Sequence, residues 1–532
     1  MKKTIFSILL LSSLLVSCNK EMVISYNQYQ ATLRENSLLV NKETDSYYQK
    51  EKMNQIEVYN SSLNLTNITS TNDIRKITSG RSHTLLNNRD EAKILVIPIS
   101  FKDSDQTIDK NTKTAYIQSA FFGDESCTFR NSLASFYNKS SYNQLKITGQ
   151  VAPWIDLNIN SYEWKKYDSL YNGAARKVVS EAFKTLVENK YDLSFFDEQI
   201  DGIYAIYDYP YSEQISSNED DNFFWAFCDY FTTSAPSPYT WSGFCWTSFY
   251  FIYNQGGLPD ASTIIHEVGH LLGLEDYYNT DMKNASNYHP TGFFDMMDSN
   301  QGDHNAFSKY LLDWYSPKVI KQGYEGKINL KDFSTSGDSL ILPINNNYND
   351  SPFGEYLMLE YFTPKGLNYG DGYRYLYEDN DKNEQIFEFP NHHGLKIYYV
   401  DSRLGYFSKT KTVEMDYQLI CSIDDPNALT KLQSNTDFFV DFKNSNSVKP
   451  NQVADFNDEL TSNQRRPLIS LLESSGFNSF KDGKYASNDT LFTFGDSFGF
   501  DTYINLSKKI GYKFKISNIS TDSVTLSFYL NK

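Results

Sequence analysis

The stretch Ala261-Ser262-Thr263-Ile264-Ile265-His266-Glu267-Val268-Gly269-His270-Leu271-Leu272 combines helical periodicity with two histidines. Its isoleucines, valine and leucines recur at steps of three and four residues, which predicts a helix with one apolar face. Asp260 precedes the stretch and stands where an N-cap is expected. Residues four apart share one face of a helix, so the imidazoles of His266 and His270 can reach one metal ion.

Glu267 lies next to the first histidine and points to the neighbouring side of the same helix. Zinc lowers the pKa of a bound water towards 7, and a carboxylate beside that water can accept its proton. The chain has only seven histidines, so a chance His-Glu-x-x-His is rare. The pattern therefore indicates a zinc site with His266 and His270 as ligands and Glu267 as general base.

A zinc site needs a third protein ligand, and two layouts compete for it. In one layout a glutamate from a later helix binds the metal, but the chain has no glutamate between Asp276 and Gly323. In the other layout the helix stops at Gly273, which can adopt the left-handed conformation, and the chain turns back to Asp276. His289 and His304 compete in principle, but Asp276 closes a much shorter loop, at a small entropic cost.

The spacing His266-Glu-x-x-His270-x-x-Gly273-x-x-Asp276 resembles the metzincin zinc motif in its Asp-ended form. Phe294-Asp295-Met296-Met297-Asp298 resembles the metzincin Met-turn, with Met297 best placed beneath the metal. With flanking matches, residues 91–402 resemble the immune inhibitor A-like family of bacterial metallopeptidases. These matches are residues 140–149, Trp154, and residues 307–314, 355–361 and 394–401. Two residues depart from the family pattern, Asp313 where glycine is usual and Tyr399 where histidine is frequent.

The resemblance implies a zinc-dependent endopeptidase acting on protein or peptide substrates, often with structural calcium. Asp192, Asp197 and Asp201 precede an expected strand and are the acidic residues available for calcium. Their spacing lacks the glycine and glutamate of an EF-hand loop, so solvated loop acids are the simpler interpretation.

Residues 1–17 have the form of an export signal. Met1-Lys2-Lys3 is basic, and the apolar run over residues 5–16 is too short to span a bilayer as a stable helix. Leu15-Val16-Ser17-Cys18 resembles the lipobox of bacterial lipoproteins, which implies that Cys18 becomes the lipidated first residue. The lipid would hold the protein on the outer face of a bacterial membrane or cell surface. An ordinary secretory signal with a chance cysteine is the alternative.

We expect the mature protein to partition with membranes, and Cys18→Ser to release it or to stall its processing. The reason is that two acyl chains make a durable anchor, whereas a chain without them has none. Fractionation of cells that express each form, followed by immunoblotting, measures the partition. If the serine form is held as firmly as the parent, the lipoprotein assignment is wrong.

Composition divides the rest of the chain. Residues 18–90 are polar and rich in Asn, Ser and Thr, which is typical of a tether or a pro-segment. Residues 91–320 mix buried-strand and helical patterns, which predict an α+β or α/β unit. The resemblance implies that this unit is an α+β, metzincin-like zinc metallopeptidase domain with a mixed sheet and an active-site helix. Residues 321–532 carry short alternating runs and predict a β-rich C-terminal domain. The runs behind these expectations are strands at 93–101, 202–207, 339–343, 356–361, 395–400 and 524–530, a helix at 174–187, and a long surface loop at 367–385.

The cysteines leave their pairing open. Besides Cys18 the chain contains Cys127, Cys228, Cys245 and Cys421, without the Cys-x-x-Cys spacing of a zinc ribbon. Cys228 and Cys245 bracket an aromatic stretch that can form a hairpin, and an oxidising compartment would permit their union.

The net charge argues against one class of partner, and Glu267 helps to distinguish an active peptidase from a silent protein on the same fold. The net charge of −17, without a basic stripe, argues against nucleic-acid binding. A catalytically silent surface lipoprotein or adhesin on a protease fold is the main alternative to an active peptidase, and a sugar-binding lipoprotein is a third class. A silent descendant has no physical need for a carboxylate at Glu267, so its presence favours activity.

Overall fold

The structure is a computed structural model that describes residues 86–531 apart from internal gaps, together with the paired strands β1 (Ile56–Val58) and β2 (Thr66–Ile68). Cys18, the signal segment and most of residues 18–90 lie outside the described residues. No helix in the described part has the length and apolar character needed to cross a bilayer. The gaps longer than three residues are 212–222, 231–237, 280–287, 370–374, 379–383, 409–417, 433–437 and 477–485.

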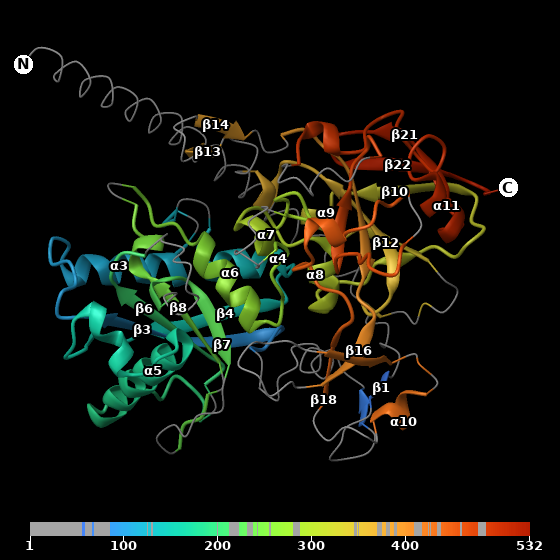
Figure 1. The fold of residues 1–532 in the computed structure, drawn as a ribbon. Helices are drawn as coiled ribbons and strands as arrows, with labels where there is room; N and C mark the ends of the chain where they lie inside the picture. The colour runs from blue at the N-terminus through green and yellow to red at the C-terminus, as the bar shows by residue number, and fades with distance from the viewer. Residues whose placement is uncertain are drawn as a thin grey trace, which may run out of the picture.

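A mixed sheet with the strand order β4-β3-β6-β8-β7 lies between the helices of the first half (Figure 1). Strands β4, β3, β6 and β8 run parallel, whereas the edge strand β7 is antiparallel to β8. The short β5 extends the sheet beside β3. In chain order the elements are β3 (Asp90–Ser100), α3 (Lys110–Phe122), α4 (Leu133–Ser140), β4 (Leu145–Val151), β5 (Ile155–Asp156), α5 (Tyr171–Glu188), β6 (Gly202–Asp208), β7 (Phe227–Tyr230), β8 (Gly243–Ser248), α6 (Ser262–Leu271), α7 (Met296–Ser299) and α8 (Ala306–Leu311).

Helices cover both faces of this sheet, which is why its central strands are continuously apolar. Because side chains alternate along a strand, Leu95 and Ile97 join the core under α5, while Ile94 and Val96 join the core that contains α3, α4 and α6. Figure 1 shows α5 on one side of the sheet and α6 on the other. The strands expected at 93–101 and 202–207 and the helix at 174–187 are confirmed as β3, β6 and α5.

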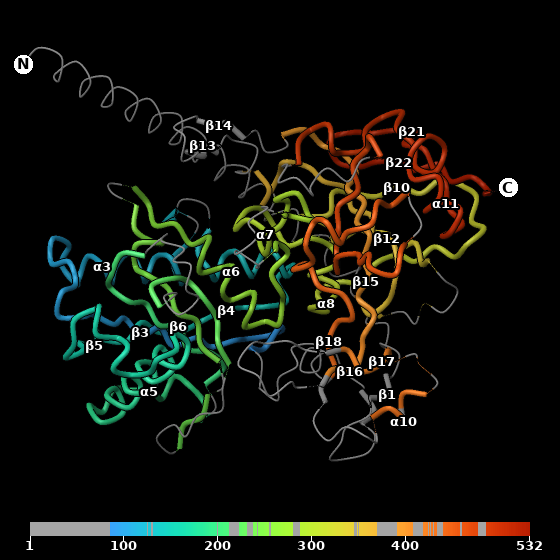
Figure 2. The backbone as a smooth tube through the Cα atoms, in the orientation of Figure 1, coloured from blue at the N-terminus to red at the C-terminus, as the bar shows by residue number. Residues whose placement is uncertain are grey.

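The chain from residue 318 onward is rich in strands. Its sheets have the orders β19-β15-β12-β11-β9, β10-β22-β21-β20 and β17-β16-β18, with a separate β13-β14 pair. Figure 2 shows β10 beside β22, which comes from the far end of the chain. The elements are β9 (Lys318–Val319), β10 (Gly326–Lys331), α9 (Phe333–Ser336), β11 (Ser339–Pro343), β12 (Glu355–Phe362), β13 (Tyr375–Glu378), β14 (Glu384–Phe387), β15 (Gly394–Asp401), β16 (Leu404–Ser408), β17 (Gln418–Ser422), α10 (Ala428–Leu432), β18 (Phe438–Phe442), β19 (Ile469–Leu472), β20 (Ser497–Phe498), α11 (Ile504–Ile510), β21 (Lys513–Ile519) and β22 (Ser523–Tyr529).

The architecture is thus α+β with several separate sheets. The strands expected in the second half are confirmed as β11, β12, β15 and β22. The loop expected over 367–385 is wrong in part, because β13 pairs there with β14. One cluster of buried side chains runs across residue 320, from Val268 of α6 to Ile341, Met358 and Tyr398.

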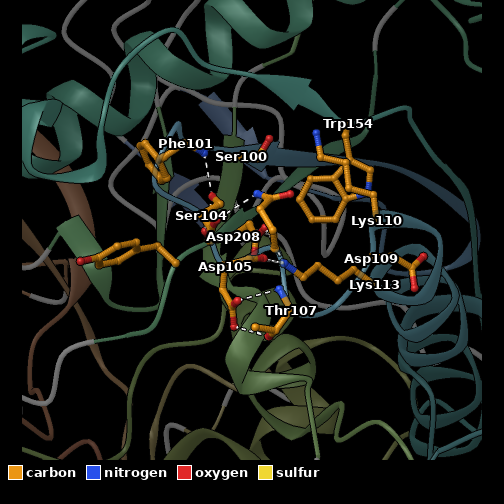
Figure 3. A network of polar contacts seen from close by, with 12 residues as sticks. Ser100, Phe101, Ser104, Asp105, Thr107, Asp109, Lys110, Lys113, Trp154 and Asp208 are labelled. Carbon is orange, nitrogen blue, oxygen red and sulfur yellow. Dashed lines mark hydrogen bonds and ion pairs between the residues drawn. The ribbon is translucent and has the colours of Figure 1, made fainter.

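A buried ion pair fixes α3 to the end of the sheet. Lys113 of α3 donates to the two carboxylate oxygens of Asp208 at 2.8 and 2.7 Å and to the carbonyl oxygen of Asp105 at 2.6 Å (Figure 3). The Lys113 and Asp208 side chains are each 1% exposed. Removing one partner of a buried ion pair typically destabilises the folded protein by about 3–5 kcal/mol. The Lys113–Asp208 pair therefore holds α3 firmly in position.

Candidate metal centre

Helix α6 begins one residue later than the sequence predicts. Its N-cap is Ala261 and not Asp260, and Ala261 makes no side-chain cap hydrogen bond. The Asp260 carboxylate still accepts from the amide of Ser262 at 2.9 Å, so it satisfies a first-turn donor from one position further out. The apolar face of α6 packs on β8, while His266 and His270 share the face that turns away from that contact.

The end of α6 reverses the chain as expected. Gly273 has a φ of 94°, a left-handed conformation that favours glycine, and the amide of Leu274 donates to the carbonyl of Gly269 at 3.0 Å. The reversal carries Asp276 back to the helix.

Three of the predicted site residues come together. The Asp276 Oδ1 atom lies 3.1 Å from His266 Nε2 and 3.3 Å from His270 Nε2. The three ligand atoms lie within 4.8 Å of one another, and no other such group of His, Cys, Asp and Glu occurs in the described ranges.

Backbone carbonyls fix the orientation of both imidazoles. His266 Nδ1 lies 2.9 Å from the carbonyl oxygen of Met296, and His270 Nδ1 lies 2.9 Å from that of Leu274. A carbonyl only accepts, so both Nδ1 atoms carry a proton and donate it. Each Nε2 therefore faces Asp276 and is available as a ligand, which is the orientation that outer hydrogen bonds give to metal-binding histidines.

The charges of the cluster suit a cation. Burial alone would raise the pKa of Asp276, but His270 and His266 hold it well below its ordinary value. Burial alone would lower the pKa of His270, yet the Asp276 carboxylate raises that pKa well above its ordinary value. Asp276 is therefore anionic, and the two Nε2 atoms beside it require either protons or a metal ion.

Glu267 lies beside the cluster without belonging to it. Its side chain is 5% exposed, and its Oε2 atom has no hydrogen-bond partner. Burial raises the pKa of Glu267, although the nearby His266 and His270 oppose that shift. Buried polar atoms are nearly always satisfied, so a water held at the metal position would supply the missing partner. The four residues together would accommodate a metal ion and a bound water.

Met297 is fully buried and packs against α6. A Cβ atom on Gly269 would lie only 2.4 Å from Met297 Sδ, so the helix and the methionine approach as closely as glycine permits. The Asp295 carboxylate accepts from the amides of Met297 and Asn305, at 2.7 and 2.6 Å, and burial raises the pKa of Asp295 to about 8. The Asp295 carboxylate thus fixes the turn at α7 through two backbone hydrogen bonds.

The competing histidines lie outside the cluster. His289 Nδ1 lies 2.5 Å from Asp298 Oδ1, and its ring stacks on Phe293 at 3.5 Å. His304 is 1% exposed and packs against the rings of Tyr137 and other aromatic residues, and neither of its nitrogens has a hydrogen-bond partner.

The acids considered for calcium do not converge. Asp201 accepts from the amide of Lys93 at 2.9 Å, Asp197 pairs with the Lys93 ammonium, and Asp192 accepts from the amide of Ser194 in its own loop. Asp197 and Asp201 thus contact Lys93 on β3, and Asp192 holds the backbone of its own loop.

Two tyrosines that the sequence reasoning missed also border the cluster. The Tyr278 ring lies 6.3 Å from that of His266 and 6.0 Å from that of His289. The Tyr230 hydroxyl, on β7, donates to the carbonyl of His270. The position of Tyr278, two residues after Asp276, was a signal available in the sequence, whereas the approach of β7 to α6 was not.

Comparison with protein-family models and with curated proteins finds no match. The resemblance to the immune inhibitor A-like family therefore rests on motifs. One of the two departures from the family pattern can be related to the backbone. Asp313, which stands where the family usually has glycine, has a φ of 59°, in the region that favours glycine. The Asp313 carbonyl accepts from Arg89 at 2.9 Å, so the turn serves to join distant segments.

Proposed function

We propose that this protein is a zinc endopeptidase of the metzincin type, similar to the immune inhibitor A-like peptidases. The observation that carries the proposal is the convergence of His266 Nε2, His270 Nε2 and Asp276 Oδ1, with each Nδ1 donating to a backbone carbonyl. His266, His270 and Asp276 would hold zinc. Glu267 would act as the catalytic base.

The residues of the chain then divide the chemistry. A bound zinc ion supplies an acidified water and polarises the peptide carbonyl. Glu267 accepts the proton of the attacking water at its unsatisfied Oε2 atom and passes it to the nitrogen of the leaving amine. Its buried position suits this exchange, because burial raises the pKa of Glu267 and brings its acid form nearer to neutral pH. Asp276 stays anionic throughout and lowers the net charge of the centre.

Several features support the finer, metzincin-like assignment. The first half combines a mixed sheet that ends in an antiparallel strand with a zinc-motif helix packed against it. Met297 lies against Gly269 under that helix, where the resemblance expects a Met-turn.

The remaining parts of the proposal follow from the sequence. Protein or peptide substrates fit the chemistry, a lipid on Cys18 would hold the enzyme to a membrane outside the cell, and the net charge of −17 argues against nucleic acid. The silent adhesin is the second candidate. The buried Glu267 carboxylate disfavours it, because such a group is destabilising unless something uses it.

The experiment is cleavage of a mixed peptide library by the purified mature protein, with the cuts mapped by mass spectrometry. We expect cuts that a chelator abolishes and added zinc restores, since the ligand set is suited to zinc. Metal analysis of the same preparation provides the control for loading. No cut from a zinc-loaded preparation would transfer the assignment to the silent adhesin.

A further inference from the structure

A pair of cysteines lies directly opposite one another on β7 and β8. In the register of these antiparallel strands Cys228 faces Cys245. Opposite residues in such a pair have Cα atoms about 4.5–5.5 Å apart, inside the range of about 4.4–6.8 Å that disulfides span. The two side chains lie on the same face of the sheet, where Cys245 belongs to the core and Cys228 packs against it. Both are present as thiols in the structure.

The pair lies directly behind the zinc-motif helix. Cys245 Sγ donates to the backbone carbonyl of Glu267 across 3.4 Å. Tyr230 follows Cys228 by two residues on β7, and its hydroxyl donates to the carbonyl of His270. The cysteine pair and the edge strand thus contact the backbone of Glu267 and of His270, one residue beside the candidate metal centre and one within it.

The two thiols differ in access. Cys245 is fully buried, whereas Cys228 is partly exposed on the edge strand. An external disulfide can therefore reach Cys228 first, and Cys245 stands in place to resolve the product. The other described cysteines are elsewhere: Cys127 contacts the carboxylate of Asp124, and Cys421 lies on β17 in a separate sheet.

We propose that Cys228 and Cys245 form a thiol–disulfide pair whose closure staples the edge strand β7 to β8 behind α6. The Cys228 thiolate attacks an external disulfide, such as glutathione disulfide, forms a mixed disulfide and releases one glutathione thiol. The Cys245 thiolate then attacks the Cys228 sulfur, forms the Cys228–Cys245 bond and releases the second thiol. The protein loses two electrons and two protons, and the external disulfide gains them.

Closure has two physical consequences. It cross-links the segment between the two cysteines and restricts the unfolded chain, so the oxidised form is more stable. It also removes the Cys245 S–H that donates to the Glu267 carbonyl, so the backbone of the zinc-motif helix loses one donor when the staple forms. The inference is independent of the proposed peptidase function, because neither Cys228 nor Cys245 is a proposed metal ligand or catalytic residue.

The test compares the purified mature protein after reduction and after equilibration with glutathione disulfide. Free thiols are blocked with N-ethylmaleimide, the protein is digested without reduction, and peptides are mapped by mass spectrometry. We expect Cys228 and Cys245 in one cross-linked peptide pair and Cys127 and Cys421 labelled. The oxidised form should melt several degrees higher than the reduced form.

Variants make the result specific. Cys228→Ser should abolish both the cross-link and the rise in melting temperature, whereas Cys127→Ser, the matched control at the other partly exposed cysteine, should keep both. The proposal is overturned if both thiols stay labelled after oxidation, if Cys228 stays capped by glutathione, or if it links to Cys127 or Cys421. None of these readouts requires peptide cleavage, so a failure of the peptidase assignment remains distinguishable.

Discussion

Replacing Glu267 with alanine is expected to leave zinc binding near stoichiometric while turnover of peptides falls by several orders of magnitude. The carboxylate lies outside the ligand cluster, so its loss removes no metal ligand. A general base contributes about 10²–10⁴-fold, and loss of water positioning adds to this. Metal analysis and the rate of peptide hydrolysis on the same preparation measure the two effects.

The neighbouring acid provides a matched control for this experiment. Glu275 is exposed and lies beside the ligand Asp276, so Glu275→Ala removes the same group from the same region without touching the proposed chemistry. It should retain zinc and turnover. Proteolysis that persists in a clean Glu267→Ala preparation would overturn the assignment of the base.

Asp276→Ala is expected to lower zinc occupancy and to abolish peptide cleavage, whereas His289→Ala and His304→Ala leave zinc content unchanged. Asp276 Oδ1 faces both Nε2 atoms, and its loss leaves two imidazoles where a zinc site needs three protein ligands. His289 is bound to Asp298, and His304 is enclosed by aromatic rings. Metal analysis of the three purified variants measures the effect.

The two histidine variants also guard against misfolding as an explanation. His304→Ala empties a packed, buried position and should lower stability, because buried large-to-small changes leave a cavity. Unchanged zinc in a less stable His304 variant would show that occupancy reports ligands and not stability. Full zinc in Asp276→Ala, or zinc loss in either histidine variant, would transfer the ligand role and weaken the metzincin assignment.

The candidate site was predictable because its parts are local. His266, His270 and Asp276 lie within one helix and the turn that follows it, so spacing and one glycine determine their approach. Strand β3 and helix α5 were also predictable, because the apolar run of β3 and the apolar periodicity of α5 each lie within one element.

What escaped prediction depends on contacts between distant segments. Helix α3 buries Lys113 among its few inward residues, so its sequence lacks a clean apolar stripe. The carbonyl of Met296 that orients His266 comes from the turn at α7, and only the tertiary fold brings it there. The hairpin that carries Cys228 and Cys245 was suggested by the sequence, but their directly opposite positions depend on the register of β7 on β8, which a sequence leaves open when a hairpin loop is long.

The pairing of β10 with β22 has a consequence for how this chain is made. Synthesis runs from the N-terminus, so β10 is made long before β22, the strand that lies between it and β21. Until β22 is made, β10 has no strand partner in its sheet, and unpaired strands invite pairing with other chains. The core under α6 also draws on strands beyond residue 320. The candidate metal centre therefore gains its full support only late in synthesis.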